Sequence, residues 1–270
     1  MKTPAAILVE QRKPLLIDEV ELPSLSYGQV LVQVRATRLC GSQLGEIEGV
    51  KGVDRYLPHL LGHEAGGIVV EVGPEVTQVR AGDRVVLHWR PGAGIQAAPA
   101  KYRLGGQTVN AGNITTFQGL TVVSENRLTR IPAAVDFETA ALLADTITTG
   151  FGAVTRDAGV SIGESVVVVG VGGIGLGVVL GAHLAGAHPI IAVDVHDHKL
   201  VKAREFGATH VLNSRDGNLA EQISSILAGP ADAVFDVTGN PAVIQQAWRA
   251  TGPKGRLVLV GVMRHDQEFS

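Results

Sequence analysis

Cysteine and aromatic residues are scarce in this sequence. Its 270 residues include one cysteine, Cys40, and phenylalanine, tryptophan and tyrosine together account for 4%. A single cysteine excludes an internal disulfide bond and suits a protein kept in a reducing cytoplasm. The 34 glycines instead indicate a chain with many tight turns and close contacts between helices and sheets.

Strong charge and long apolar runs are also absent. The formal net charge is −3, which gives no reason to expect nucleic acid or an anionic membrane as a partner. The glycine-punctuated apolar segment 165–180 is too interrupted for a membrane span, which needs about 20 apolar residues. The N-terminus lacks a signal-peptide cleavage region. With 45% hydrophobic and 18% charged residues, the composition is that of a globular protein. A chain of 270 residues is long enough for two modest domains.

The first half of the chain has the pattern of an all-β barrel or sandwich. Short apolar runs, several of which alternate with polar residues, are separated by turn residues. They predict strands at residues 6–9, 15–20, 29–35, 67–72 and 83–88. Residues 89–116 show no period, and we expect a long surface lobe or loop there.

The second half alternates strands with helices, after a first helix at 137–143. Strands are expected at 165–169, 189–193, 211–213, 233–237 and 256–260, with helices at 174–186, 199–206, 219–227 and 241–250. This alternation predicts a doubly wound parallel α/β sheet. We therefore expect a first domain over residues 1–150 and a second over residues 151–270.

A glycine-rich turn follows the first strand of that sheet. Gly170 permits the tight turn, Gly172 lets the backbone approach a pyrophosphate, and Gly175 allows close packing of helix on strand. Gly173 lies in the same turn, at the helix N-terminus that would face the phosphates. Asp194 comes 19 residues after Gly175 and would accept both ribose hydroxyls, which favours NAD over NADP. The alternative is a strand–helix turn with no ligand.

Lys199 follows this acid and has two interpretations. Its ammonium group can reach the ribose or adenine side of a bound dinucleotide, or it can be a solvated surface charge. The sequence does not separate these two roles.

Cys40 and the segment Gly62-His63-Glu64 hold candidate zinc ligands. Thiolate, imidazole and carboxylate are typical ligands of zinc, but Cys40 lies 23 positions before His63 and only the fold can bring them together. Taken alone, Cys40 is better explained as a small buried apolar residue, and the alternative for His63 is a hydrogen-bonded core histidine.

Together these motifs resemble the zinc-dependent medium-chain alcohol and polyol dehydrogenases. The family's zinc signature, G-H-E-x-x-G-x-x-x-x-x-G-x-x-V, is matched in full by Gly62, His63, Glu64, Gly67, Gly73 and Val76. Residues 82–85 (GDRV) and 149–152 (TGFG) match two further family segments. The resemblance implies an N-terminal GroES-like β-barrel catalytic domain followed by a Rossmann dinucleotide-binding domain.

The resemblance also implies a set of metal ligands. Cys40 and His63 match the first two ligands of one catalytic zinc ion, and Asp145 stands where many members have a third ligand, a cysteine. The oxygen of Asp145 is a harder ligand than sulfur, so metal preference can shift. Glu64 matches an acid beside the metal that can ligate transiently.

Further positions match groups around the substrate and the cofactor. Ser42 corresponds to the hydroxyl that takes the substrate proton, although a turn-capping hydroxyl is the alternative. Thr149 and Ile174 correspond to residues that pack behind the nicotinamide. The implied reaction is hydride transfer from the CH–OH group of a small-molecule alcohol or polyol to NAD, with zinc acting as a Lewis acid.

The chain departs from the family in three places near the site. Cys40 is the sole cysteine, so the family's lobe of four cysteines with a structural zinc cannot form, and residues 90–116 must fold in another way. Gly45 replaces the histidine that often ends the proton relay, for which His59, Glu46 or water are candidate substitutes. Gln43 replaces the acid that orients the ligand histidine, and we expect its amide to accept the same hydrogen bond.

The fourth departure concerns the end of the sequence. Family members normally continue beyond the fifth strand of the second domain and return to the catalytic domain, so we expect a C-terminally shortened, incomplete Rossmann sheet. A homo-oligomer is possible, but the usual interface strand is absent from this sequence. Two other functions stay open: a zinc-free NAD(P)H quinone or enone reductase, and a non-catalytic truncated nucleotide-binding protein.

Overall fold

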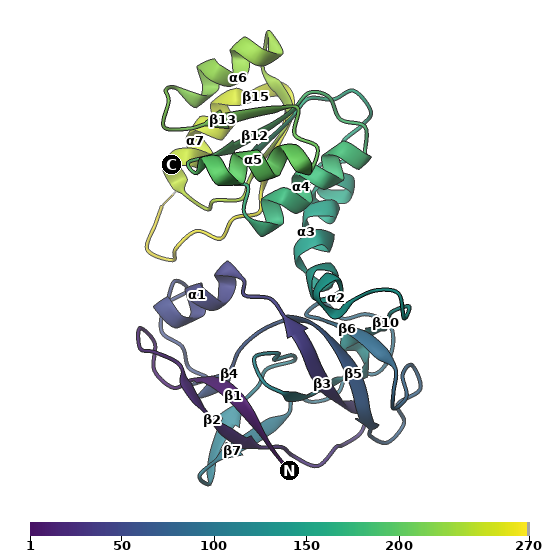
Figure 1. Ribbon diagram of the computed structural model, residues 1–270. Coiled ribbons are helices and arrows are strands. Elements are labelled where there is room, and N and C mark those ends of the chain that lie inside the picture. The colour runs from purple at the N-terminus through teal and green to yellow at the C-terminus, as the bar shows by residue number, and fades with distance from the viewer. Residues whose placement is uncertain (269–270) are drawn as a thin grey trace. The chain divides into compact units, whose positions relative to one another are not determined.

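The computed structural model describes residues 1–268 and divides into two compact units. The first unit is Met1–Asp145 and the second is Thr146–Ser270, and each is described by itself below (Figure 1). Among the described residues, no helix combines the length and the apolar character needed to cross a membrane.

The first unit contains a closed barrel and a second antiparallel sheet. The barrel strands, in the order β1-β2-β7-β8-β4, are β1 (Lys2–Leu8), β2 (Leu16–Glu21), β7 (Lys101–Leu104), β8 (Gln107–Asn110) and β4 (His59–Leu60). The second sheet, in the order β10-β6-β5-β3-β9, contains β10 (Leu128–Arg130), β6 (Arg84–His88), β5 (Glu64–Val72), β3 (Gln29–Thr37) and β9 (Leu120–Ser124). The expected barrel-type first domain is therefore confirmed.

The expectation of a long surface lobe or loop over residues 89–116 was wrong in part. Strands β7 and β8 form an antiparallel hairpin that turns at Gly105 and Gly106, both with positive φ. Tyr102 and Val109 face each other across this hairpin and are fully buried in the barrel core. Each strand is four residues long and offers one buried side chain, so sequence alternation was too brief to identify it.

Two helices bring the candidate ligands of the first unit close to the second sheet. The short helix α1 (Gly41–Glu48), which the sequence pattern did not predict, begins directly after Cys40 and ends at Gly49 in the left-handed conformation. Helix α2 (Phe137–Ala144) packs on β5, where a Cβ at Gly66 would lie 2.6 Å from the carbonyl oxygen of Phe137. Glycine at that position therefore permits the close approach that carries Asp145 toward His63. A 3₁₀ turn, Glu125–Arg127, links β9 to β10.

The second unit is a five-stranded parallel sheet with helices on both faces. Its strands, in the order β13-β12-β11-β14-β15, are β13 (His210–Asn213), β12 (Ile190–Asp194), β11 (Val166–Val169), β14 (Ala231–Asp236) and β15 (Thr251–Leu259). The helices are α3 (Thr146–Gly152), the π-helical turn Ala153–Asp157, α4 (Gly173–Leu184), α5 (Asp197–Glu205), α6 (Leu219–Leu227) and α7 (Pro241–Ala250). This arrangement confirms the doubly wound α/β sheet.

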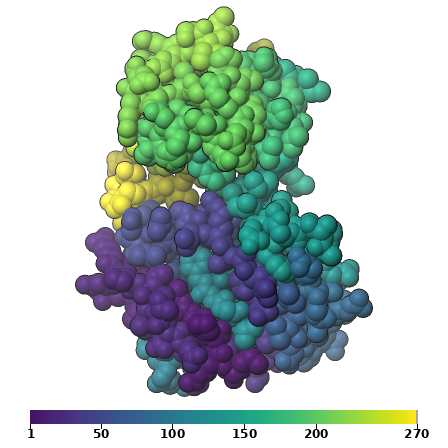
Figure 2. Space-filling view, viewed as in Figure 1, coloured from purple at the N-terminus to yellow at the C-terminus, as the bar shows by residue number. Residues whose placement is uncertain are grey.

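Alternate side chains of the central strand β11 pack against the helices on opposite faces of this sheet. Val166 and Val168 pack in one core with α4 and α5, whereas Val167 and Val169 pack in the other with α6 and α7. The apolar run is therefore continuous because both faces are covered. Figure 2 shows this unit in space-filling form, with the green segment that holds α5 on the face toward the viewer.

We expect Gly175→Ala to destabilise the second unit, because a Cβ there would lie 2.0 Å from the carbonyl oxygen of Gly170. Relief of such overpacking typically costs about 1–3 kcal/mol. Gly172→Ala is the matched control, since nothing lies within 4 Å of its Cβ position and its φ is −73°. Denaturant unfolding of both variants checks this expectation, and equal stabilities would contradict it.

Candidate metal centre

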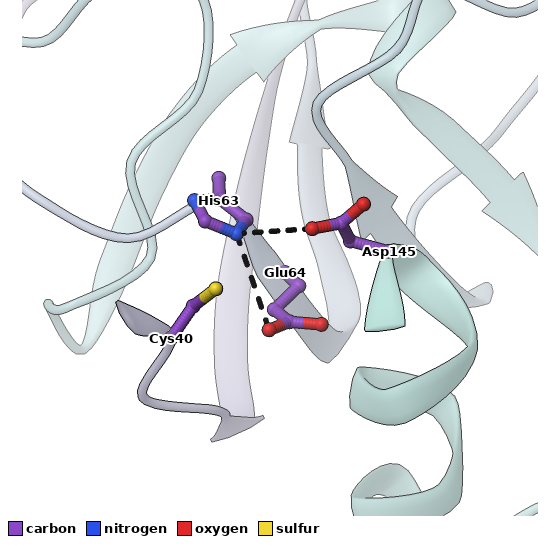
Figure 3. A group of neighbouring side chains, drawn as sticks. All are labelled: Cys40, His63, Glu64 and Asp145. Atoms are coloured by element: carbon purple, nitrogen blue, oxygen red, sulfur yellow. Dashed lines mark ion pairs between the residues drawn. The ribbon is translucent and has the colours of Figure 1, made fainter. Parts of the chain in front are cut away.

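Four potential metal ligands converge in the first unit, although they come from three separate segments of the chain. Cys40 precedes α1, His63 and Glu64 stand at the start of β5, and Asp145 is the C-cap residue of α2. Each offers one ligand atom, and these atoms all lie within 4.8 Å of one another. Figure 3 shows the four side chains directed toward a common point.

His63 stands at the centre of this cluster. Its Nε2 lies 3.2 Å from Asp145 Oδ2 and 4.0 Å from Glu64 Oε1 (Figure 3). Glu64 is fully buried and Asp145 is 8% exposed. A thiolate, an imidazole and a carboxylate at this separation fit zinc, which binds nitrogen and sulfur at about 2.0–2.3 Å.

Without a metal, the same groups behave as a hydrogen-bonded ionic cluster. A hydrogen bond from His63 lowers the pKa of Cys40 to about 7, against the opposing effect of burial. Burial lowers the pKa of His63, but hydrogen bonds to Asp145 and Cys40 outweigh it and raise this pKa to about 10. Without a metal, protonated His63 therefore supplies the positive charge that faces the thiolate of Cys40 and the carboxylate of Asp145.

The carboxylate of Glu64 is held by a cation from the end of β3. Arg38 Nη1 lies 2.8 Å from Glu64 Oε1. A fully buried carboxylate needs such a partner, because the desolvation of an unpaired charge is costly. Arg38 was not identified from the sequence, in which nothing marks it as a partner of Glu64.

Ser42 and Gln43 lie behind the imidazole of His63. Ser42 Oγ is 3.5 Å from His63 Nδ1, and Gln43 Nε2 is 2.6 Å from the same atom. The amide oxygen of Gln43 instead accepts from the backbone N–H of Cys40 at 2.9 Å. Ligation of a metal through Nε2 places the remaining proton on Nδ1, so the expected acceptor role of Gln43 requires its amide to turn over.

The candidate ends of a proton relay differ in their surroundings. His59 contacts the carboxylate of Asp54 at 2.9 Å and the carbonyl oxygen of Leu60 at 2.8 Å, so both of its ring nitrogens are engaged. Glu46 lies four residues after Ser42 on α1 and hence on the same helix face. Burial raises the pKa of Glu46.

The glycine turn and its acid come together within the second unit. Gly170 has φ +91°, and α4 begins at Gly173 with Gly172 as its N-cap. Asp194 is buried at the end of β12, where Oδ2 accepts from the Val171 backbone N–H at 3.0 Å. The turn and the acid are thus joined by a hydrogen bond at the carboxyl ends of the strands of this sheet.

The other residues expected to bind the cofactor also lie in this unit. Lys199 Nζ is 3.7 Å from Asp194 Oδ2, so Lys199 pairs with the acid in this structure. Ile174 packs against the core that α4 shares with the sheet. Thr149 lies on α3, which packs on α4 through the close approach of Gly150 to Gly177.

The chain matches known sequence families in both units. Residues 26–133 match the alcohol dehydrogenase GroES-like domain, and residues 173–270 match the zinc-binding dehydrogenase family.

Two similar proteins extend these matches along the chain. The S-(hydroxymethyl)glutathione dehydrogenase of Paracoccus denitrificans is 32% identical over 304 residues, which cover 100% of this chain and 81% of that protein. The class-3 alcohol dehydrogenase of Cereibacter sphaeroides is 33% identical over 297 residues, which cover 97% of this chain and 79% of that protein.

Solved structures agree with these matches. An alcohol dehydrogenase zinc-binding domain protein from Burkholderia ambifaria superimposes with a TM-score of 0.91 at 30% identity, covering 100% of this chain and 80% of that one. The benzyl alcohol dehydrogenase of Acinetobacter calcoaceticus gives 0.89 at 27% identity, with coverages of 100% and 80%.

We expect zinc to bind more tightly as the pH rises, because ligation needs Cys40 as the thiolate and His63 without its proton. Between pH 7 and pH 10, set by the two pKa values, binding displaces one proton and the affinity should rise about tenfold per pH unit. Below pH 7 it displaces two, so the rise should be about hundredfold per unit.

Competition with a chromophoric chelator from about pH 6 to pH 9 measures this dependence. The Cys40→Ser variant should lose the steeper limb below pH 7, since its hydroxyl does not titrate there. An affinity independent of pH would refute the ionic cluster.

Proposed function

Because the chain belongs to the family of zinc-binding medium-chain alcohol dehydrogenases, we propose that it transfers a hydride between the CH–OH group of a small alcohol or polyol and NAD. The observation that supports this most is the convergence of Cys40, His63 and Asp145, with Glu64 beside them, in the first unit. We propose a catalytic domain of residues 1–150, which includes this unit, and a dinucleotide-binding domain of residues 151–270.

We propose that Cys40, His63 and Asp145 hold one zinc ion. When bound, zinc supplies Lewis-acid stabilisation of the negative charge that develops on the substrate oxygen. Two anionic ligands and one neutral ligand balance the charge of the ion, as a set with two cysteines would. The carboxylate of Glu64 is paired with Arg38. We therefore propose that Glu64 is not one of the three permanent ligands but a neighbouring acid that can ligate the ion transiently.

Ser42 is the proposed acceptor of the substrate's hydroxyl proton. In this structure its Oγ accepts a hydrogen bond from Gln43 Nε2 at 3.1 Å, and once the amide of Gln43 turns over, this contact is no longer made by the Nε2 donor. Glu46 is the proposed next acceptor, because it lies one helical turn further on the same face of α1 and its pKa is raised. This carboxylate would take over the role of the family's relay histidine, whose position is occupied by Gly45 in this chain.

In the second unit, the open space at Gly172 and the N-terminus of α4 suit a pyrophosphate. Asp194 would accept the ribose hydroxyls and repel a 2′-phosphate, with Lys199 beside it. Thr149 and Ile174 are the proposed supports of the nicotinamide. A cytoplasmic location agrees with the single free thiol.

Zinc content and turnover together test this proposal. Purified protein should hold one zinc ion per chain and reduce NAD⁺ when alcohols are supplied. Zinc with no reduction of NAD⁺ by any alcohol would contradict it, and NADH binding without turnover would support a non-catalytic protein. Turnover of quinones or enones without zinc would support the reductase instead, although that reaction leaves the ligand cluster without a role.

We expect Asp145→Ala to reduce both zinc content and activity. Loss of a direct ligand should cost more than the roughly 10- to 100-fold that loss of an outer partner costs. Asp18→Ala removes an exposed carboxylate on β2 of the same unit and should change neither quantity. Metal analysis and steady-state kinetics provide the comparison.

Asp194→Ala should weaken NAD binding and reduce its preference over NADP by about 10- to 100-fold, as expected when a charged hydrogen bond of roughly 1.5–3 kcal/mol is lost. The exposed neighbour Asp197 supplies the control, Asp197→Ala. Gly172→Ala should weaken NAD binding without loss of stability, since its Cβ has space in the protein alone. NADH fluorescence titration measures each affinity, and unchanged binding in both site variants would place the cofactor elsewhere.

A further inference from the structure

Trp89 is not one of the proposed ligands, but its side chain contacts the proposed ligand Asp145. Its indole Nε1 donates a hydrogen bond of 2.8 Å to Asp145 Oδ1. The second carboxylate oxygen, Oδ2, is the one that lies 3.2 Å from His63 Nε2. The two oxygens of Asp145 are therefore different: an indole N–H engages one, and the other faces the ligand cluster.

This difference matters because a carboxylate can ligate a metal through one oxygen or through both. With Cys40 and His63, one oxygen of Asp145 makes three donor atoms, the usual number for a catalytic zinc site that keeps a position for substrate. Both oxygens would make four donor atoms, the number of a closed structural site.

The main chain around Trp89 is fixed on both sides. Arg127, which is buried, donates from Nη1 to the carbonyl oxygen of Trp89 and from Nη2 to Gln96 Oε1 at 2.9 Å. His88 contacts the carbonyl oxygen of Arg90 at 2.7 Å and Thr129 Oγ1 at 3.0 Å.

The side chain of Trp89 is 46% exposed, so burial does not account for its direction. The indole N–H is the part of the residue with a specific partner in the ligand cluster. A donor that is held rigidly at its backbone can keep one carboxylate oxygen engaged while the other is used.

We propose that Trp89 is a positioning residue that keeps Asp145 a one-oxygen ligand and thereby leaves one coordination position of the metal to a small molecule. This inference rests on the proposed function, because it assumes that Asp145 ligates a metal. It adds the group that decides how many donor atoms Asp145 provides.

The test uses protein loaded with cobalt(II), whose visible absorption reports coordination number, and azide and imidazole as small ligands. Wild-type protein should retain one cobalt ion per chain and bind one azide or imidazole. The W89F variant keeps the ring but lacks the N–H. It should retain cobalt, shift its absorption before any azide is added, and bind both small ligands at least about tenfold more weakly. W248F changes the other tryptophan, 65% exposed on α7, and should match the wild type.

A second background separates this role from general support of the fold. In D145C, the third ligand is a thiolate with a single donor atom, so it cannot close the site as a carboxylate can. The W89F change should therefore alter azide binding by less than about twofold in D145C. An equal loss in both backgrounds would show that Trp89 supports the structure and would overturn the proposal.

Two further outcomes would also overturn it. One is W89F with the absorption and azide affinity of the wild type, and the other is W89F that no longer retains cobalt, because a two-oxygen ligand should hold the ion. Wild-type protein that binds neither cobalt nor zinc would refute the proposed function as well. Metal binding by the wild type with an unchanged W89F would refute the role of Trp89 alone.

Discussion

The contact between His63 and Asp145, 3.2 Å from Nε2 to Oδ2, joins the strand and the helix on which the candidate metal centre depends. It is possible because α2 packs directly on β5, where Gly66 leaves no side chain between them. With Cys40 on the other side, the imidazole lies between two anionic partners. Burial of charge on this scale is stable only when each charge is paired, so the pairing that stabilises the metal-free site also assembles the ligands.

The segment in which the family has four cysteines is held by a buried carboxylate. Glu125 is fully buried, and its oxygens accept from the backbone N–H groups of Thr77, Gln78 and Ile95 at 2.5, 2.6 and 2.8 Å. Burial alone would raise the pKa of Glu125, but these hydrogen bonds together outweigh it and lower this pKa. Hydrogen bonds to a charged acceptor thus fix the start of this segment at Ile95. Arg127, two residues after Glu125, donates a hydrogen bond to the carbonyl oxygen of Trp89.

The two candidate sites differ in how much of them is local. In the second unit, the glycines of the turn are close in sequence and the acid follows after one helix and one strand, so a single βαβ unit contains the pattern. In the first unit, the candidate ligands are separated by 22 and 81 intervening residues, counted from Cys40 to His63 and from His63 to Asp145. Their proximity depends on the pairing of β3 with β5 and on the packing of α2.

The sequence alone determined the order of strands and helices in the second unit, the glycine turn, the barrel character of the first unit and the residue types at the metal centre. These follow from periodicity, backbone freedom at glycine and a motif with fixed spacing, all of which are local. The hairpin within residues 89–116, helix α1 and the partners Arg38 and Trp89 were decided by tertiary structure. Their roles come from which atoms burial and sheet pairing bring within hydrogen-bond distance, and no local pattern encodes that distance.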